Sequence, residues 1–200
     1  GAQTLKEEVL KIKNRGHTLK DTKEAIQLLK DSLLKTTFHM MPGLPDADRK
    51  RVTREKDIAS LREIFEDEAY IPDMLKLYPC MVMPGTELEN DHQVGIFSPL
   101  TTLEAADIIV EAKKFVPEYC RIMRVQRDIP TNVTGAGVDR TNLRQYVERL
   151  AKERNVRCRC IRCREVKFDG IYGMPNIIVR EYSAGKGKEF EEGKLSLEDL

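Results

Sequence analysis

The 200-residue sequence lacks several features that mark specialised classes of protein. It has no apolar run of about 18 residues, so we expect no membrane-spanning helix and no membrane partner. It has no charged segment followed by an apolar one at its start, so we expect no secretory leader. It also shows no internal repeat.

Cysteines are few, and their number is odd. Three of the five lie close together, between positions 158 and 163. This pattern favours a metal site in a reducing cytosol over a disulfide framework, so we expect a cytoplasmic protein. With 40% hydrophobic and 34% charged residues, the composition is that of a soluble globular protein. The length allows one domain with a sizeable core or two small ones.

Charge is distributed unevenly along the chain. Between Arg121 and Lys167, eleven arginines and two lysines stand against five acidic residues, a local net charge of +8, whereas the whole chain carries +1. A basic segment on an otherwise acidic protein is typical of a phosphate-rich partner such as nucleic acid. A solvated arginine-rich face is the alternative interpretation, because long-range charge acts on association rather than on folding.

Hydrophobic periodicity predicts an α/β fold, with short extended runs between amphipathic helices. Thr101 and Glu104 have capping-box spacing, and Thr141 is the expected N-cap of the last helix. The alternation implies parallel β-α units, whose working residues lie at the carboxyl ends of the strands. The expected helices are 24–34, 57–66, 101–115 and 141–153, and the expected strands are 35–42, 74–83 and 120–130.

Three strands cannot close a barrel, and the chain begins without a methionine and without a strand before its first helix. We therefore expect the chain to be part of a larger protein. After Lys167 the sequence becomes rich in glycine, with one strand-like run, "NIIVREY", and one loop-like run, "SAGKGKE". This change indicates the beginning of a second domain.

The stretch "RCRCIRCREV" (157–166) combines thiols with arginines. Cys158, Cys160 and Cys163 form a C-x-C-x-x-C cluster, and thiolates are preferred ligands of zinc, which takes four ligands in a structural site. Three unliganded thiols and an iron–sulfur cluster are the alternatives. The flanking arginines would lower the thiol pKa and point toward phosphates. The candidates for a fourth ligand are Cys80, Cys120, His17, His39, His92 or a residue elsewhere in the protein, and the flanking arginines are Arg157, Arg159, Arg162 and Arg164.

Two further residues at the expected strands have two interpretations each. His39 would bind a ligand at the mouth of a barrel, or it is a packed histidine with one backbone partner. Lys76 alternates with Leu75 and Leu77, so it is a functional charge inside a barrel or a solvated one on an open sheet. Cys80 and Cys120 are interpreted first as core residues.

Seven stretches occur in the order found in one family: "GAQT", "NRGHT", "HMMPGLP", "LKLYPCMVMPGTEL", "RVQRDIP", "NLRQ" and "RCRCIRCREV". Over roughly residues 1–185 the chain resembles the catalytic subunit of Elongator, in its archaeal and bacterial branch. The resemblance implies the second half of a radical S-adenosylmethionine (SAM) barrel, a partial TIM-type β/α barrel, at 1–130. It implies a basic linker with a zinc knuckle at 131–170, and the first strands of a GNAT-like acetyltransferase domain at 171–200.

The implied activity is modification of the wobble uridine of tRNA. In the family, SAM on a [4Fe–4S] cluster yields a radical that abstracts hydrogen from the methyl group of acetyl-CoA. The resulting carbon adds to carbon 5 of the uridine, and thioester hydrolysis releases CoA, leaving a carboxymethyl-type group. The implied partners are acetyl-CoA, the anticodon stem-loop of tRNA, and either a second copy or Elongator-type accessory subunits.

The resemblance assigns roles to residues at the matching motifs. Gln3, His39, Met41, Pro42, Gln126 and Arg127 would line the pocket for SAM and acetyl-CoA. Cys158, Cys160 and Cys163 would hold zinc between the two domains. Arg157, Arg159, Arg162, Arg164, Arg124 and Lys76 would contact the RNA. No individual catalytic residue is assigned.

Ala2 stands where the family usually has valine, and three larger departures limit these roles. The cluster-binding C-x-x-x-C-x-x-C motif is not within these 200 residues, and the expected acetyltransferase-like domain stops after its first strands. The segment after Gly85 and Thr86 lacks the usual aromatic and basic residues. Two other functions therefore stay open. One is a zinc-stapled RNA-binding module without catalysis, and the other is a protein lysine acetyltransferase.

Overall fold

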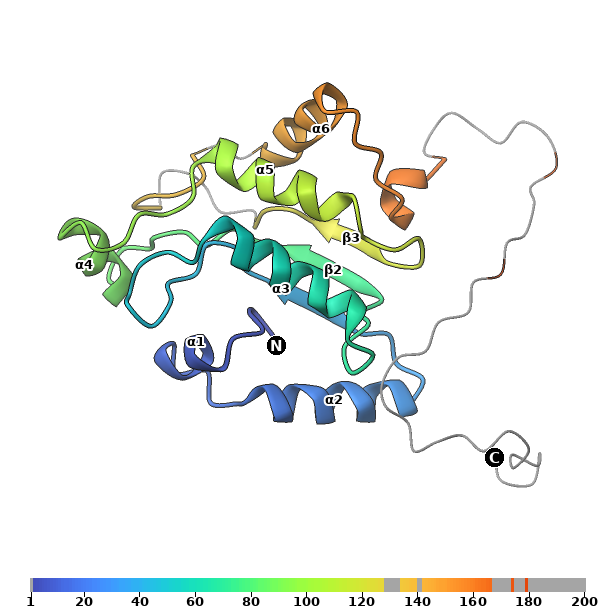
Figure 1. The fold of residues 1–200 in the computed structure, drawn as a ribbon, viewed down its shortest axis with the longest axis horizontal. Coiled ribbons are helices and arrows are strands. Elements are labelled where there is room, and N and C mark those ends of the chain that lie inside the picture. The colour runs from blue at the N-terminus through green and yellow to red at the C-terminus, as the bar shows by residue number, and fades with distance from the viewer. Residues whose placement is uncertain (1, 128–133, 140–141, 167–173, 175–178, 180–200) are drawn as a thin grey trace.

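The computed structural model describes residues 2–127, 134–139, 142–166, 174 and 179. It shows a three-stranded sheet with helices packed around it (Figure 1). The elements in chain order are α1 (Glu7–Ile12), α2 (Leu19–Asp31), β1 (Thr37–Met40), α3 (Arg54–Glu66), β2 (Met74–Leu77), α4 (Glu87–Gln93), α5 (Thr102–Lys113), β3 (Arg121–Arg124), α6 (Leu143–Glu153) and the 3-10 turn η2 (Ile161–Arg164).

The sheet confirms the predicted parallel β-α organisation. Its strands lie in the order β1-β2-β3, and both neighbouring pairs are parallel. All three strands are four residues long, shorter than the apolar runs that predicted them. Because the strands are parallel, their carboxyl ends lie at the same end of the sheet, toward α4 in Figure 1.

Helix starts follow from side-chain caps. The α5 capping box is formed as predicted, because Glu104 N–H donates to the Thr101 hydroxyl and the Thr101 N–H donates to the Glu104 carboxylate. Helix α2 begins earlier than the apolar pattern indicated, because Thr18 and Asp21 form a second capping box. The predicted N-cap Thr141 lies outside the described residues, and Asn142 precedes α6 without a side-chain cap.

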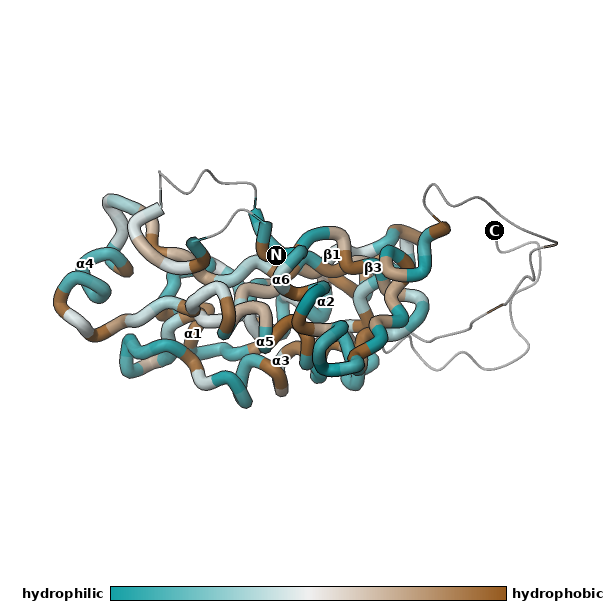
Figure 2. The backbone as a smooth tube through the Cα atoms, turned by 90° about the horizontal axis from the view of Figure 1, so that it is seen from above, coloured by the Kyte–Doolittle hydropathy of each residue, from teal (hydrophilic) through white to brown (hydrophobic). Residues whose placement is uncertain are grey.

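The sheet has two unlike faces because side chains alternate along each strand. On one face Phe38, Met40, Leu75, Leu77 and Ile122 are at most 4% exposed. They share one core with apolar residues of α3 and α5. Figure 1 shows these two helices side by side over the sheet, and Figure 2 shows that apolar stretches gather along the strands and hydrophilic ones at the periphery.

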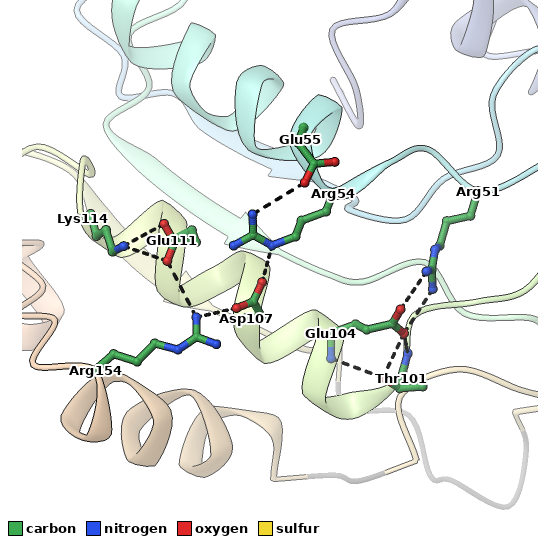
Figure 3. Close-up of polar contacts among 9 residues, drawn as sticks. All are labelled: Arg51, Arg54, Glu55, Thr101, Glu104, Asp107, Glu111, Lys114 and Arg154. Carbon is green, nitrogen blue, oxygen red and sulfur yellow. Dashed lines mark hydrogen bonds and ion pairs between the residues drawn. The ribbon is translucent and has the colours of Figure 1, made fainter.

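Ion pairs connect the outer helices to one another (Figure 3). Asp107 on α5 accepts from Arg54 of α3 and from Arg154, the residue after α6. Glu104 accepts from Arg51 at 2.8 Å. Three covering helices are thus fastened through the exposed side of α5. We call Arg51, Arg54 and Arg154, with Glu104 and Asp107, the helix clamp.

The predicted linker boundary and the acetyltransferase-like segment (171–200) fall almost entirely outside the described residues, so those boundaries stay predictions. Within the described part of the chain, every helix is too short or too polar to cross a bilayer. The described strands form an open sheet, as expected from their number.

Candidate functional site

Backbone hydrogen bonds align the segments at the strand carboxyl ends. The Met41 N–H donates to the Gln3 carbonyl at 2.9 Å, and the Cys80 N–H donates to the Pro42 carbonyl at 2.8 Å. Gln3, Met41 and Pro42 also line one small cavity together with Asp57. Three of the six predicted pocket residues therefore come together in space.

Basic side chains are register partners across the three strands. His39 is paired with Lys76, and Lys76 is paired with Arg124, after an irregularity in the β2-β3 register between Leu75 and Lys76. The His39 ring packs edge-on against Tyr78 with centroids 4.4 Å apart, and its buried Nε2 has no hydrogen-bond partner among the residues that the structure describes. Burial lowers the pKa of His39, and the charge of Lys76 lowers it further. A neutral imidazole beside cations can donate one hydrogen bond from its N–H to an anionic ligand.

A carboxylate of α3 holds the loop that follows β1. The Gly43 N–H donates to the Asp57 carboxylate at 2.8 Å, and Gly43 has a φ of +80°, a conformation that side chains disfavour. A Cβ at this position would lie 2.7 Å from the Leu100 side chain. Burial raises the pKa of Asp57 to about 7. The geometry of the "HMMPG" turn thus depends on a carboxyl group that sequence reasoning missed.

Gln126 and Arg127 follow β3 at the same edge of the sheet. The Gln126 side-chain oxygen accepts from the Leu143 N–H at 3.2 Å, which satisfies a donor at the start of α6. Arg127 is exposed, and its charge contributes to the lowered pKa of His39. Both residues therefore lie near the strand ends, and Gln126 also positions α6.

The three clustered cysteines converge in space. The Sγ atoms of Cys158, Cys160 and Cys163 all lie within 4.8 Å of one another. A tetrahedral ion with Zn–S bonds of about 2.3 Å places its sulfurs about 3.8 Å apart, so this arrangement fits zinc with small adjustments. The neighbouring thiols lower the pKa of Cys160 well below its usual range, and the same contacts raise that of Cys158. We call residues 157–164 the cysteine knuckle.

None of the five candidates for a fourth ligand joins this group among the described residues. The nearest in the fold is Cys120, whose carbonyl accepts from the Ile161 N–H at 3.0 Å. Burial raises the pKa of the Cys120 and Cys80 thiols to about 12, which supports their interpretation as core residues. His17 and His92 each use Nδ1 on a backbone carbonyl.

The arginines of the knuckle differ in their local partners. Arg157 and Arg159 are exposed, Arg162 is half-buried, and Arg159 lies 3.5 Å from Glu118. Arg164 donates to the carbonyls of Arg159 and Glu118 at 2.7 and 2.6 Å, so it braces the loop. Arg157, Arg159 and Arg162 are thus the knuckle cations best placed for an outside anion.

The two predicted sites lie at opposite ends of β3. The knuckle contacts the start of the strand, where the Ile161 N–H donates to the Cys120 carbonyl at 3.0 Å and Arg121 pairs with Glu165. The pocket residues lie beyond its other end, past Arg124. Figure 1 shows η2 at the end of the sheet away from α4. The four residues of β3, at about 3.3 Å each, separate the two sites, so the sites lie at opposite ends of one sheet.

Comparison with known proteins assigns the family. Residues 72–153 match the Radical_SAM C-terminal domain. The whole chain is 42% identical to the "tRNA uridine(34) acetyltransferase" of Methanocaldococcus infernus, of which it covers 37%. Over 94% of its length it is 36% identical to human "Elongator complex protein 3", of which it covers 35%. The chain belongs to the Elongator complex protein 3 family.

A solved structure of the Elongator complex protein 3 family has the same fold. It is archaeal Elp3 of Methanocaldococcus infernus with an N-terminal deletion (1–46), with a TM-score of 0.84 and 41% identity. The match covers 92% of this chain and 44% of that one. The chain therefore spans less than half the length of the relatives it matches, and its fold is that of a radical SAM-related α/β domain.

Proposed function

We propose that the protein containing this chain modifies the wobble uridine of tRNA. The observation that carries the proposal is the 42% identity, over the whole chain, to a protein named tRNA uridine(34) acetyltransferase. The residues at the two ends of the sheet support the proposal. One end presents a pocket edge with a neutral histidine, and the other presents arginines on a compact loop.

The finer chemistry follows the radical SAM assignment. A [4Fe–4S] cluster with SAM, when bound, would supply a radical that activates the methyl group of acetyl-CoA for addition to carbon 5 of the uridine. The cluster ligands must come from sequence other than these 200 residues. Gln3, Met41 and Pro42, whose backbone hydrogen bonds align the segments at the strand ends, would line the pocket, and His39 would bind a polar group of SAM or acetyl-CoA through Nε2. Gln126 and Arg127 would line the side of this pocket that follows β3.

Zinc would be bound by Cys158, Cys160 and Cys163. The convergence of their sulfurs supports this assignment, because metal binding would fix the knuckle and lower the entropy lost when its arginines meet phosphates. Arg157, Arg159 and Arg162 would contact the anticodon stem, with Arg164 bracing the loop. Lys76 and Arg124 would attract the anticodon loop, whose unpaired bases can be splayed toward the pocket.

The test uses the full-length protein with SAM, a reductant, acetyl-CoA and tRNA that carries uridine at the wobble position. Nucleoside mass spectrometry should detect a modified uridine, and omission of either SAM or acetyl-CoA should abolish it. His39→Ala should remove most of the product while tRNA affinity and zinc content stay unchanged.

The two alternatives predict different results in the same assay. Tight tRNA binding without a modified nucleoside, despite an intact iron–sulfur cluster, would favour the RNA-binding module. Acetylation of peptides in the absence of tRNA would favour the lysine acetyltransferase. A second copy or accessory subunits would appear as a larger species in light scattering of the purified protein or its complex.

A further inference from the structure

Helix α5 carries one buried lysine. Lys113 follows Ile109 and Val110 at helical spacing, on the apolar side of the helix, and is only 3% exposed. Burying an ammonium group is costly unless a hydrogen-bonding partner compensates the lost water. Among the described residues, the Lys113 Nζ donates to the Sγ of Cys163 at 3.5 Å.

The adjacent lysine has a different environment. Lys114 is exposed, and its Nζ lies 2.7 Å from the carboxylate of Glu111 on the same helix. Lys113 instead crosses from α5 to a loop fifty residues later in the chain. Its contact is therefore a property of the tertiary fold, and Lys114 provides a matched control.

Charge explains why an ammonium suits this position. Three thiolates around Zn²⁺ carry a net charge of −1, and a buried net charge is unfavourable in a protein interior. One ammonium beside the thiolates makes the group neutral. Hydrogen bonds to metal ligands also orient them, and their loss weakens metal binding.

We propose that Lys113 is a positioning residue of the cysteine knuckle: its ammonium donates to Cys163 and neutralises a three-thiolate zinc complex. This inference rests on the proposed zinc site.

The experiment measures the zinc affinity of the full-length protein by competition with a chromophoric chelator. Lys113→Met removes the charge and keeps an apolar stem, and it should weaken zinc binding about 10- to 100-fold. Lys114→Met should bind zinc like the wild type. Lys113→Arg, which retains the positive charge, should stay within about threefold of the wild type.

The outcomes separate this inference from the zinc proposal. A wild-type protein without zinc affinity would overturn the zinc site itself. A folded Lys113→Met protein with wild-type affinity would overturn the role of Lys113 alone, even if its melting temperature had changed. Recovery of the Lys113→Met fold only at high zinc would support the role, since metal binding then supplies folding free energy. Should Lys113→Met stay unfolded, a folded Lys113→Arg protein that has lost its zinc would reject the proposal, and retained affinity would support it.

Discussion

Two groups of arginines illustrate how one residue type serves two purposes in this fold. In the helix clamp, Arg51, Arg54 and Arg154 each donate to carboxylates of α5, and Figure 3 shows these pairs converging on one helix. In the cysteine knuckle, four arginines alternate with thiols, and Glu118 lies 3.5 Å from one of them, Arg159. Charge that is neutralised inside the fold fastens helices together. Charge that is not neutralised is available to a partner.

The comparison predicts opposite outcomes for the same substitution in the two groups. The largest effect should come from reversing Arg157, Arg159 and Arg162 to glutamate together. tRNA affinity should fall about 100-fold at 0.15 M salt, and the slope of log K against log salt should flatten by about 2 to 3, because three phosphate contacts are lost. Folding should persist, since Arg157 and Arg159 are exposed, Arg162 is half-buried, and solvated arginines add little stability. Filter binding over a salt series measures both quantities.

Arg54→Glu is the control from the helix clamp. It places a negative charge beside Asp107, so it should lower the melting temperature without changing tRNA affinity. If the knuckle variant, still folded and zinc-loaded, bound tRNA with unchanged affinity and slope, its arginines would be only a solvated face. The RNA path would then be sought at Arg121, Arg124 and Arg127.

Removal of a thiol should weaken tRNA binding less than reversal of the three arginines, because it acts through the loss of zinc. Cys160 is fully buried, and its sulfur is close to both other thiols, so Cys160→Ser should reduce zinc from about one ion per protein to a small fraction. tRNA affinity should fall about tenfold, because the arginines would have to be ordered on binding. Cys80→Ser is the matched control, since Cys80 lies in a separate core cluster. Undiminished zinc in Cys160→Ser would contradict the assignment.

A substitution in the helix clamp should lower the stability of the fold and leave tRNA affinity unchanged. Asp107→Asn removes the charge that Arg54 and Arg154 share, and the Asp107 side chain is only 20% exposed. We expect the free energy of unfolding to fall by about 1–2 kcal/mol, since both arginines can still reach water. Urea denaturation measures this change. Equal losses of stability and tRNA affinity would show that the two groups are not independent.

Sequence patterns predicted the features that depend on neighbouring residues. The capping box at Thr101, the parallel order of strands and the convergence of the three cysteines all follow from short spacing rules. Helix α4 was missed, although Thr86 and Glu89 carry a similar spacing. An expectation built only on apolar periodicity cannot detect a seven-residue helix that is mostly polar.

Contacts between distant segments could not be predicted in this way. The spacing of Lys113 after Ile109 places it on the buried side of α5, but the sequence does not show that Cys163 meets it there. Asp57 depends likewise on the path of the loop that ends at Gly43. The separation of knuckle and pocket along β3 follows from chain topology, which no local motif contains.

The smallest expected effect concerns acid stability at the edge of the helix clamp. A hydrogen bond from Arg51, with two more from Thr101, lowers the pKa of Glu104 from its ordinary value of 4.5 to about 2. A carboxyl group with a lowered pKa in the folded state stabilises the protein above pH 4.5, and this contribution is lost as the pH falls toward 2. Glu104→Gln should therefore lower the melting temperature by about 2 °C at pH 7 and by progressively less below pH 4.

Thermal unfolding of the wild type and of Glu104→Gln from pH 7 to pH 3 measures the difference. Glu66→Gln is the control, because Glu66 is an exposed residue in an i,i+4 pair with Arg62. Parallel curves for Glu104→Gln and the wild type would mean that Arg51 stabilises the clamp through packing, and the contrast between neutralised and available arginines would then rest on Arg54 and Arg154 alone.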